Sequence, residues 1–203
     1  MIKEFEDIRQ GLAVAMSAYK TVDLAAYESL VPAEGSGAKA ADIARRVDEA
    51  LGQTLPASFI EALTRWDLGR ARLGNIVFSL QGDYAAYLVS CNEFRAGLSW
   101  WDDRGTEERP LDRLMIAQGD PYVVLLDAAS GAIETYAASD GSFTNVPVAP
   151  DLDRFLRALG TIEVTPPEGL NPVDDVVNAL LAELGSGFDR SFWTVMVRGR
   201  ADP

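Results

Sequence analysis

The chain has 203 residues, 48% of them hydrophobic, which is enough to bury a complete core within one domain. Eighteen Lys and Arg against 31 Asp and Glu give a net charge of −13. The average surface field therefore attracts basic proteins and argues against nucleic-acid binding, although acidity can also serve solubility alone. Because the chain has no histidine, Ser-His-Asp and Cys-His nucleophiles and His-ligated metal sites are excluded.

The sequence also bears on the compartment. No window approaches the roughly 18–20 continuous apolar residues that a membrane span needs. The first ten residues are charged and lack the apolar core of a signal peptide. The only cysteine, Cys91, forbids an internal disulfide and agrees with a reducing environment. We therefore expect a cytoplasmic protein without membrane contact.

Three helices are predicted in the first third of the chain. Over residues 3–20, apolar side chains recur at steps of three and four, at Phe5, Ile8, Leu12, Met16 and Tyr19. Residues 32–37 form a loop, and a second helix over residues 38–51 stops at Gly52. A third helix begins near Pro56, a residue suited to a first helical turn.

The next segment is predicted to be a hairpin that leads into a helix. Two apolar runs, residues 76–80 and 84–89, flank the turn Gln81-Gly82-Asp83 and indicate two strands. Ser90 and Glu93 have the spacing of a capping box, which predicts a helix over about residues 91–101.

Residues 109–160 predict an antiparallel meander followed by a helix. Apolar runs at residues 114–117, 122–126 and 132–137 are separated by turn residues at hairpin spacing. The helix that follows carries one apolar face, made of Leu152, Phe155, Leu156 and Leu159.

Residues 161–203 predict a turn, a helix and a last strand. Residues 165–169 contain two prolines and a glycine and indicate a turn. The helix predicted after this turn carries an apolar stripe along one face, made of Val173, Val176, Val177, Leu180, Leu181 and Leu184. Residues 192–197 are almost all apolar and indicate a strand that is buried on both faces or against another chain. The helical stripe fits docking on the main sheet or dimerisation, so monomer and homodimer both stay open.

The predicted fold class is α+β, a mostly antiparallel sheet of about five to six strands with helices packed at both ends. Three of its segments carry a more specific pattern. They are LPASFIEALTRWD at residues 55–67, the predicted hairpin of residues 74–89, and IAQGDPYVVLLDAASGAIETY followed by DLDRFLRAL. In this order they resemble the SUKH superfamily, which includes Smi/Knr-type regulators of yeast and many bacterial immunity proteins.

The resemblance covers residues 38–160, and we expect a SUKH-like domain over residues 1–160. Its N-terminal helix and residues 161–203 have no counterpart in the family. Residues 161–203 are then an extension, a helix plus a strand, packed on the same domain. The resemblance further implies a module that binds another protein, with no catalytic residues, cofactor or metal ligands to carry over. The positions shared with the family are expected to be structural: Leu55, Pro56, Phe59, Asp127 and Gly131. The chain departs from the family where Asp67-Leu68-Gly69 replaces the usual Asn-Gly.

The most specific functional expectation is an immunity protein that neutralises a cognate secreted toxin domain by direct binding. The best candidate contact is an aromatic and acidic segment: Trp100, Trp101, Asp102, Asp103, Glu107 and Glu108. Tryptophan supplies rigid contact area, and carboxylates pair with a basic partner. The opposing interpretation places one or both tryptophans in the core. Because adjacent helical residues point about 100° apart, both could not face fully inward from a helix.

There are two alternative functions. One is a regulatory or scaffolding module without a toxin partner. The other is a carboxylate-dependent enzyme, which sequence-adjacent acids do not support because such catalysis needs two carboxyl groups at a defined separation around a cleft. We therefore expect no enzymatic activity.

Overall fold

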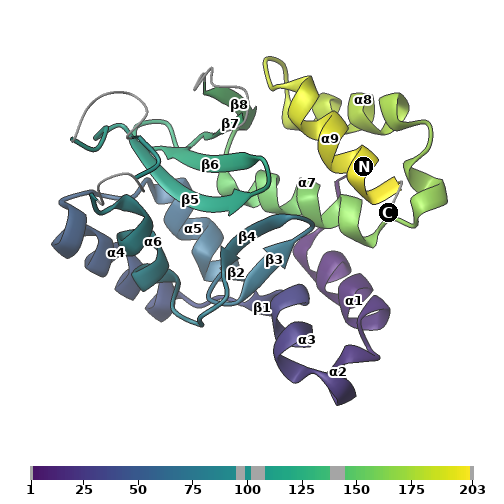
Figure 1. The fold of residues 1–203 in the computed structure, drawn as a ribbon, viewed down its shortest axis with the longest axis horizontal. Helices are drawn as coiled ribbons and strands as arrows, with labels where there is room; N and C mark the ends of the chain where they lie inside the picture. Colours follow the sequence, from purple (N-terminus) through teal and green to yellow (C-terminus); the bar gives the residue numbers. More distant parts are fainter. Residues whose placement is uncertain (1, 95–98, 102–107, 138–144, 202–203) are drawn as a thin grey trace.

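The protein is described by a computed structural model that covers residues 2–94, 99–101, 108–137 and 145–201 (Figure 1). Within these residues, a six-stranded antiparallel sheet has the order β3-β4-β5-β6-β7-β8. The strands are β3 Ala71–Leu73, β4 Ile76–Ser79, β5 Arg113–Gly119, β6 Tyr122–Asp127, β7 Ile133–Ala137 and β8 Val146–Ala149. A second small sheet pairs β1 (Ala33–Glu34) with β2 (Trp66–Asp67). The predicted α+β class is confirmed.

The helices surround this sheet, and α7 lies at their centre. They are α1 Phe5–Ala15, α2 Tyr19–Val22, α3 Leu24–Leu30, α4 Gly37–Leu51, α5 Ala57–Arg65, α6 Tyr84–Asn92, α7 Leu152–Val164, α8 Val173–Leu184 and α9 Arg190–Ala201. A 3-10 helix, Pro167–Leu170, joins α7 to α8. Helix α7 contacts α1, α5 and α9 as well as β3 and β8. It therefore links the N-terminal helix, the sheet and the C-terminal extension.

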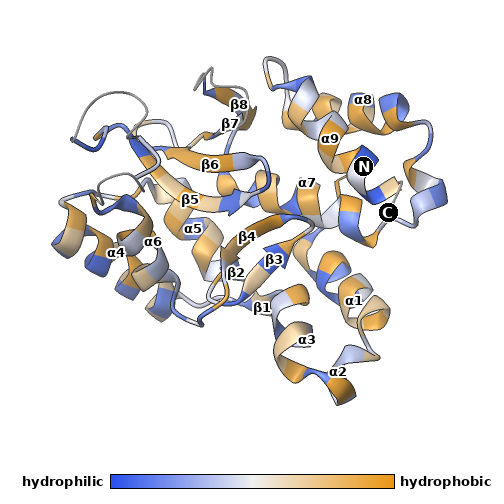
Figure 2. Ribbon diagram, in the orientation of Figure 1, coloured by the Kyte–Doolittle hydropathy of each residue, from blue (hydrophilic) through white to orange (hydrophobic). Residues whose placement is uncertain are grey.

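Both faces of the central strands are buried. Leu114, Ile116, Val124 and Leu126 belong to the main core, which also contains the inner faces of α1, α5, α7, α8 and α9. Met115 and Leu125 alternate with them and belong to a second cluster on the opposite side of the strands. This two-sided burial explains why β5 and β6 are almost continuously apolar in the sequence. Figure 2 shows the hydrophobic residues concentrated along these central strands.

The predictions for the meander and several helices are confirmed. Strands β5, β6 and β7 overlap the three predicted runs, and α7 presents the predicted apolar face. Helix α4 ends at Leu51 and is capped by the predicted stop residue Gly52, whose backbone is left-handed with φ 61°. The short strands β3 and β8 were not predicted, because three or four residues are too few to show an alternating hydrophobic pattern. In β8, Pro147 also argues against a strand. Its edge position makes that proline tolerable.

The prediction of a strand over residues 84–89 and a helix over about 91–101 is wrong. Residues 84–92 form α6, whose first turn is capped by Asp83 Oδ1 accepting from the Ala86 N–H at 2.9 Å. Buried Tyr84, Leu88 and Asn92 follow at helical spacing. Ser90 lies inside this helix and caps nothing.

The prediction of a last strand over residues 192–197 is also wrong, because this segment lies within α9. The buried residues Phe192, Trp193, Met196 and Val197 have the i, i+1, i+4, i+5 spacing of one helical face. Val195 lies on the outer side and is 44% exposed. Burial of one face therefore replaces the two-sided burial that the apolar run suggested.

Helix α9 covers the outer edge of the sheet at β8. The Asp189 N–H donates to the Pro147 carbonyl at 2.7 Å, and Trp193 Nε1 donates to the Val148 carbonyl at 3.0 Å. The ring of Phe192 packs edge-to-face on Tyr122, with centroids 5.0 Å apart. Residues of the extension thus satisfy carbonyls that an edge strand would otherwise expose.

Candidate partner-binding surface

Trp100 and Trp101 are buried, so the prediction that they present an exposed contact area is wrong. Trp100 is 7% and Trp101 0% exposed, and their rings pack edge-to-face with centroids 5.3 Å apart. They cover Met115 and Leu125 on the outer side of the strands. Both rings can point inward because residues 99–101 form a bend and turn and not a helix.

A hydrogen-bonded asparagine holds the tryptophan segment against the sheet. Asn92 Oδ1 accepts from Trp100 Nε1 at 3.1 Å and from the Met115 N–H at 2.8 Å. Asn92 Nδ2 donates to the carbonyls of Leu88 and Met115, at 2.9 and 2.8 Å. The Tyr136 hydroxyl donates to the Trp100 carbonyl at 2.8 Å. These contacts assign the tryptophans to the structure of the sheet.

The acidic half of the predicted contact is placed only in part. Glu108 is exposed, whereas Asp102, Asp103 and Glu107 lie outside the described residues. The neighbouring Arg109 donates to the Leu51 carbonyl at 3.3 Å, which places Arg109 at the C-terminal end of α4.

The five family positions occupy two segments that meet in space. Leu55 and Phe59 are buried in the main core, and Pro56 precedes the first turn of α5. Gly131, with φ 81°, lies in the β6–β7 turn; a Cβ there would meet Ser58 Oγ at 2.3 Å and Pro56 Cβ at 3.5 Å. Only glycine lets the turn approach the start of α5 this closely.

Asp127 organises the same β6–β7 turn. Its Oδ1 accepts from the backbone N–H groups of Ala129 and Ser130 at 2.9 and 2.8 Å, and its Oδ2 lies 3.1 Å from Arg113. Partial burial acts to raise the pKa of Asp127, but these N–H groups and the charge of Arg113 lower it on balance. The carboxylate is thus committed to the turn and to the ion pair.

Of the eight large hydrophobic side chains that are exposed among the described residues, four lie on an N-terminal arm, residues 14–30. The arm comprises the end of α1 with α2 and α3. Val14, Tyr19, Val22 and Leu24 are 71%, 48%, 86% and 55% exposed. Neither α2 nor α3 contains a buried residue. Figure 1 shows both helices projecting below the rest of the molecule, and Figure 2 shows their hydrophobic residues. Such a patch is typical of a contact surface.

Polar contacts give the arm a defined shape. Asp23 Oδ1 accepts from the Ala26 N–H at 3.0 Å and caps α3. Arg70 Nη1 lies 2.9 Å from Glu28 and ties α3 to the chain before β3. The sequence pattern missed this arm because Met16 and Tyr19 continued the spacing of α1, whereas the helix ends at Ala15. Asp23, a good N-cap residue before an alanine-rich segment, was the signal that could have revealed it.

A second candidate surface is an open groove of about 460 Å³ between α4 and α6. Ala50, Ala86 and Val89 line it together with Glu49 and Glu93. Arg46 Nη1 donates to Asp83 at 2.9 Å near one end. This bond is the main cause that lowers the pKa of Asp83. The groove is shallow and less apolar than the arm.

No family model, curated protein or solved structure matches the chain. Among the described residues, no three His, Cys, Asp or Glu side chains come together where they could hold a metal ion. None of the helices in the described ranges is long and apolar enough to cross a membrane.

Proposed function

We propose that this protein is a SUKH-type binding module that neutralises a basic secreted toxin domain by covering it stoichiometrically. The observation that carries the proposal is an exposed apolar arm on a chain with a net charge of −13. We assign to the arm the contact role that was expected for the tryptophan segment. Its contact residues are Val14, Tyr19, Val22 and Leu24.

The arm and the charge act at different stages of association. Burying exposed aliphatic and tyrosine side chains supplies affinity, at about 25 cal/mol per Å² of apolar area before the costs of association are subtracted. The negative field raises the rate of encounter with a basic protein and disfavours a second acidic copy of this chain. A basic partner with an apolar groove therefore fits this surface best.

The arrangement of the family positions supports the SUKH assignment. The Leu-Pro start of α5 and the Asp–Gly turn between β6 and β7 are 76 residues apart when counted from Leu55 to Gly131 (131 − 55). Yet Gly131 lies against Pro56 and Ser58. Two motifs that resemble the family thus form one packing unit, which gives a physical reason for them to occur together.

The experiment is affinity capture from the lysate of the host at low and high salt, with three tagged chains. One is the wild type, one is Tyr19→Ser/Val22→Ser, and the third is Leu111→Ser. Leu111 is 74% exposed and follows Glu108 by three positions in the sequence. It therefore matches the arm residues in exposure but tests the acidic segment. Urea unfolding of all three chains verifies that they are equally folded.

We expect one basic protein to be retained by the wild type and by Leu111→Ser, with slower capture at high salt, and to be lost by the arm variant. Loss confined to Leu111→Ser would overturn the arm and move the contact to the acidic segment. Retention of several cell-wall or signalling proteins would replace the toxin proposal by a scaffolding function. Concentration-dependent dimerisation that the arm variant abolishes would make a second copy the occupant.

A further inference from the structure

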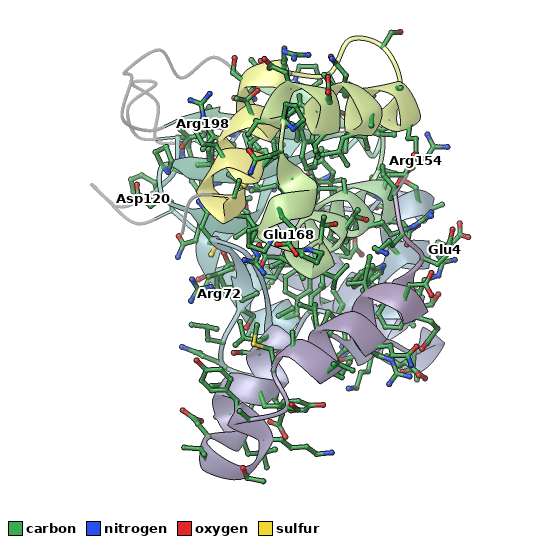
Figure 3. All side chains as sticks on the ribbon, turned by 90° about the vertical axis from the view of Figure 1, so that its right-hand side faces the viewer. Glu4, Arg72, Asp120, Arg154, Glu168 and Arg198 are labelled. Carbon is green, nitrogen blue, oxygen red and sulfur yellow. The ribbon has the colours of Figure 1, made fainter. Side chains whose placement is uncertain are left out.

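A cavity of about 360 Å³ lies where α9 meets α7 and the β3–β4 turn. One side is apolar and the other carries charge, and the two sides come from segments far apart in the sequence. The apolar lining is Leu159, Ile162, Val195 and Met196, and the charged lining is Arg72, Glu163 and Arg200. Figure 3 looks onto this face, where Arg72 lies below α9. The volume falls within the range of small-molecule sites, about 300–1,000 Å³.

The carboxylate of Glu163 is poorly satisfied in this cavity. Its closest cation is Arg200, whose Nε lies 3.9 Å from Oε2, too far for a hydrogen bond. No described group donates a hydrogen bond to this carboxylate. Its Oε1 lies against the β3–β4 turn, where a Cβ on Gly74 would be 2.9 Å away. Burial raises the pKa of Glu163 although the charges of Arg200 and Arg72 oppose the shift. A hydrogen-bond donor on a ligand would satisfy the carboxylate oxygens of Glu163.

Arg72 and Arg200 each use only one N–H group in a hydrogen bond to the described residues. Arg72 Nε donates to the Gly74 carbonyl at 2.7 Å, and Arg200 Nη2 donates weakly to the Glu163 carbonyl at 3.4 Å. Their remaining N–H groups make no hydrogen bond to the described residues. Two guanidinium groups beside one carboxylate give this site a local excess of positive charge on a strongly acidic protein.

We propose that this cavity binds a small amphipathic molecule that carries a carboxylate beside an N–H donor, of which an apolar α-amino acid is the simplest example. The carboxylate of the ligand pairs with Arg72 and Arg200, and its N–H group donates to Glu163. Its side chain rests on the apolar wall made by Leu159, Ile162 and Met196. Charge-assisted hydrogen bonds of this kind are the strong ones in proteins.

This ligand class uses all three charged groups, whereas simpler ligands use only some of them. A plain carboxylate leaves Glu163 unsatisfied and next to a second negative charge. A plain amine meets Glu163 but also two like charges. Because α9 supplies Arg200 and Met196, the C-terminal extension completes the site, a role that is independent of the arm and of any toxin.

The test is calorimetric titration of the full-length protein with L-phenylalanine, N-acetyl-L-phenylalanine and phenethylamine. The variants are Arg72→Gln, Arg200→Gln and Glu163→Gln, and the matched control is Arg198→Gln, on the same helix but outside the cavity lining. Arg72 is exposed, so its substitution leaves the fold intact even if a substitution at Glu163 or Arg200 does not.

We expect L-phenylalanine to bind the wild type and Arg198→Gln with equal affinity. Its affinity for each of the three cavity variants should be at least about tenfold lower. Equal affinity for N-acetyl-L-phenylalanine supports recognition of a neutral N–H donor, and weaker binding supports recognition of an ammonium group. Phenethylamine is expected not to bind, because it lacks the carboxylate. Absence of binding by both carboxylates, or binding that no cavity variant weakens, would overturn the proposal.

Discussion

Replacing Trp101 by alanine separates a structural role of the tryptophan segment from a role in partner contact. Trp101 is fully buried, against Trp100, Met115 and Leu125. Truncating a buried tryptophan costs about 3–5 kcal/mol, part of which here is the edge-to-face contact with Trp100. Trp101 Nε1 has no acceptor among the described residues, and deleting it relieves about 1 kcal/mol or more of desolvation cost. The expected loss is therefore about 3 kcal/mol.

Phenylalanine variants at the two positions sharpen this prediction. Trp101→Phe keeps an aromatic ring and removes an unsatisfied donor, so it should cost less than about 1.5 kcal/mol. Trp100→Phe removes the donor to Asn92 Oδ1 and leaves that buried acceptor with one partner fewer. We therefore expect Trp100→Phe to be the more destabilising of these two substitutions.

The measurement is urea unfolding followed by circular dichroism, supported by thermal melting. A loss of about 3 kcal/mol corresponds to a decrease in Tm of about 6–12 °C for a chain of this length. The m-value should stay unchanged, since the same surface unfolds. If Trp101→Ala stays within about 1 kcal/mol of the wild type but loses the captured partner, the indole is a contact residue and the reasoning from burial is refuted.

Three further predictions concern polar groups. Asn92→Leu removes four buried hydrogen bonds and should cost about 3 kcal/mol or more in urea unfolding; a cost below about 1 kcal/mol would contradict the network. Thr135 Oγ1 is buried without a partner in the described parts of the chain, so Thr135→Val should stabilise by about 1 kcal/mol, and a lower free energy of unfolding would show that the hydroxyl is satisfied. The raised pKa of Glu163 means that its contribution to stability is present at low pH and is lost as pH rises through the folded-state pKa. Glu163→Gln, neutral at every pH, should therefore gain stability relative to the wild type between pH 4 and pH 7. The quantity to compare is the free energy of unfolding of Glu163→Gln minus that of the wild type. If this difference is the same at pH 4 and pH 7, or is smaller at pH 7, the carboxylate is not desolvated.

The sequence predicts the centre of the fold better than its borders. In β5, β6 and β7 the strand pattern and the turn residues agree, and Gly131 has the positive φ that its turn requires. Helix α7 likewise shows its buried face as a periodicity of three and four. Local preference and global packing point to the same structure at these positions, and such agreement makes a pattern predictive.

The two helical segments that were wrongly predicted to be strands have a common cause. Residues 84–89 and 192–197 are short apolar runs, and their composition alone does not distinguish a buried strand from a buried helix. In both cases an aspartate decides the structure: Asp83 caps α6, and Asp189 Oδ2 accepts from the Phe192 N–H at 2.7 Å at the start of α9. A capping residue within three positions before an ambiguous run therefore outweighs the β-propensity of that run.

The burial of both Trp100 and Trp101 was missed for a reason that links these errors. An assumed helix over about residues 91–101 allowed only one of Trp100 and Trp101 to face inward. In the structure α6 already ends at Asn92, so the turn that follows can place both rings on the outer face of the sheet. At the other end of the chain, one long predicted helix placed Tyr19 on a buried face, whereas α1 ends at Ala15 and Tyr19 is half exposed. The position of two helix ends thus decides which aromatic residues form the core and which remain available to a partner.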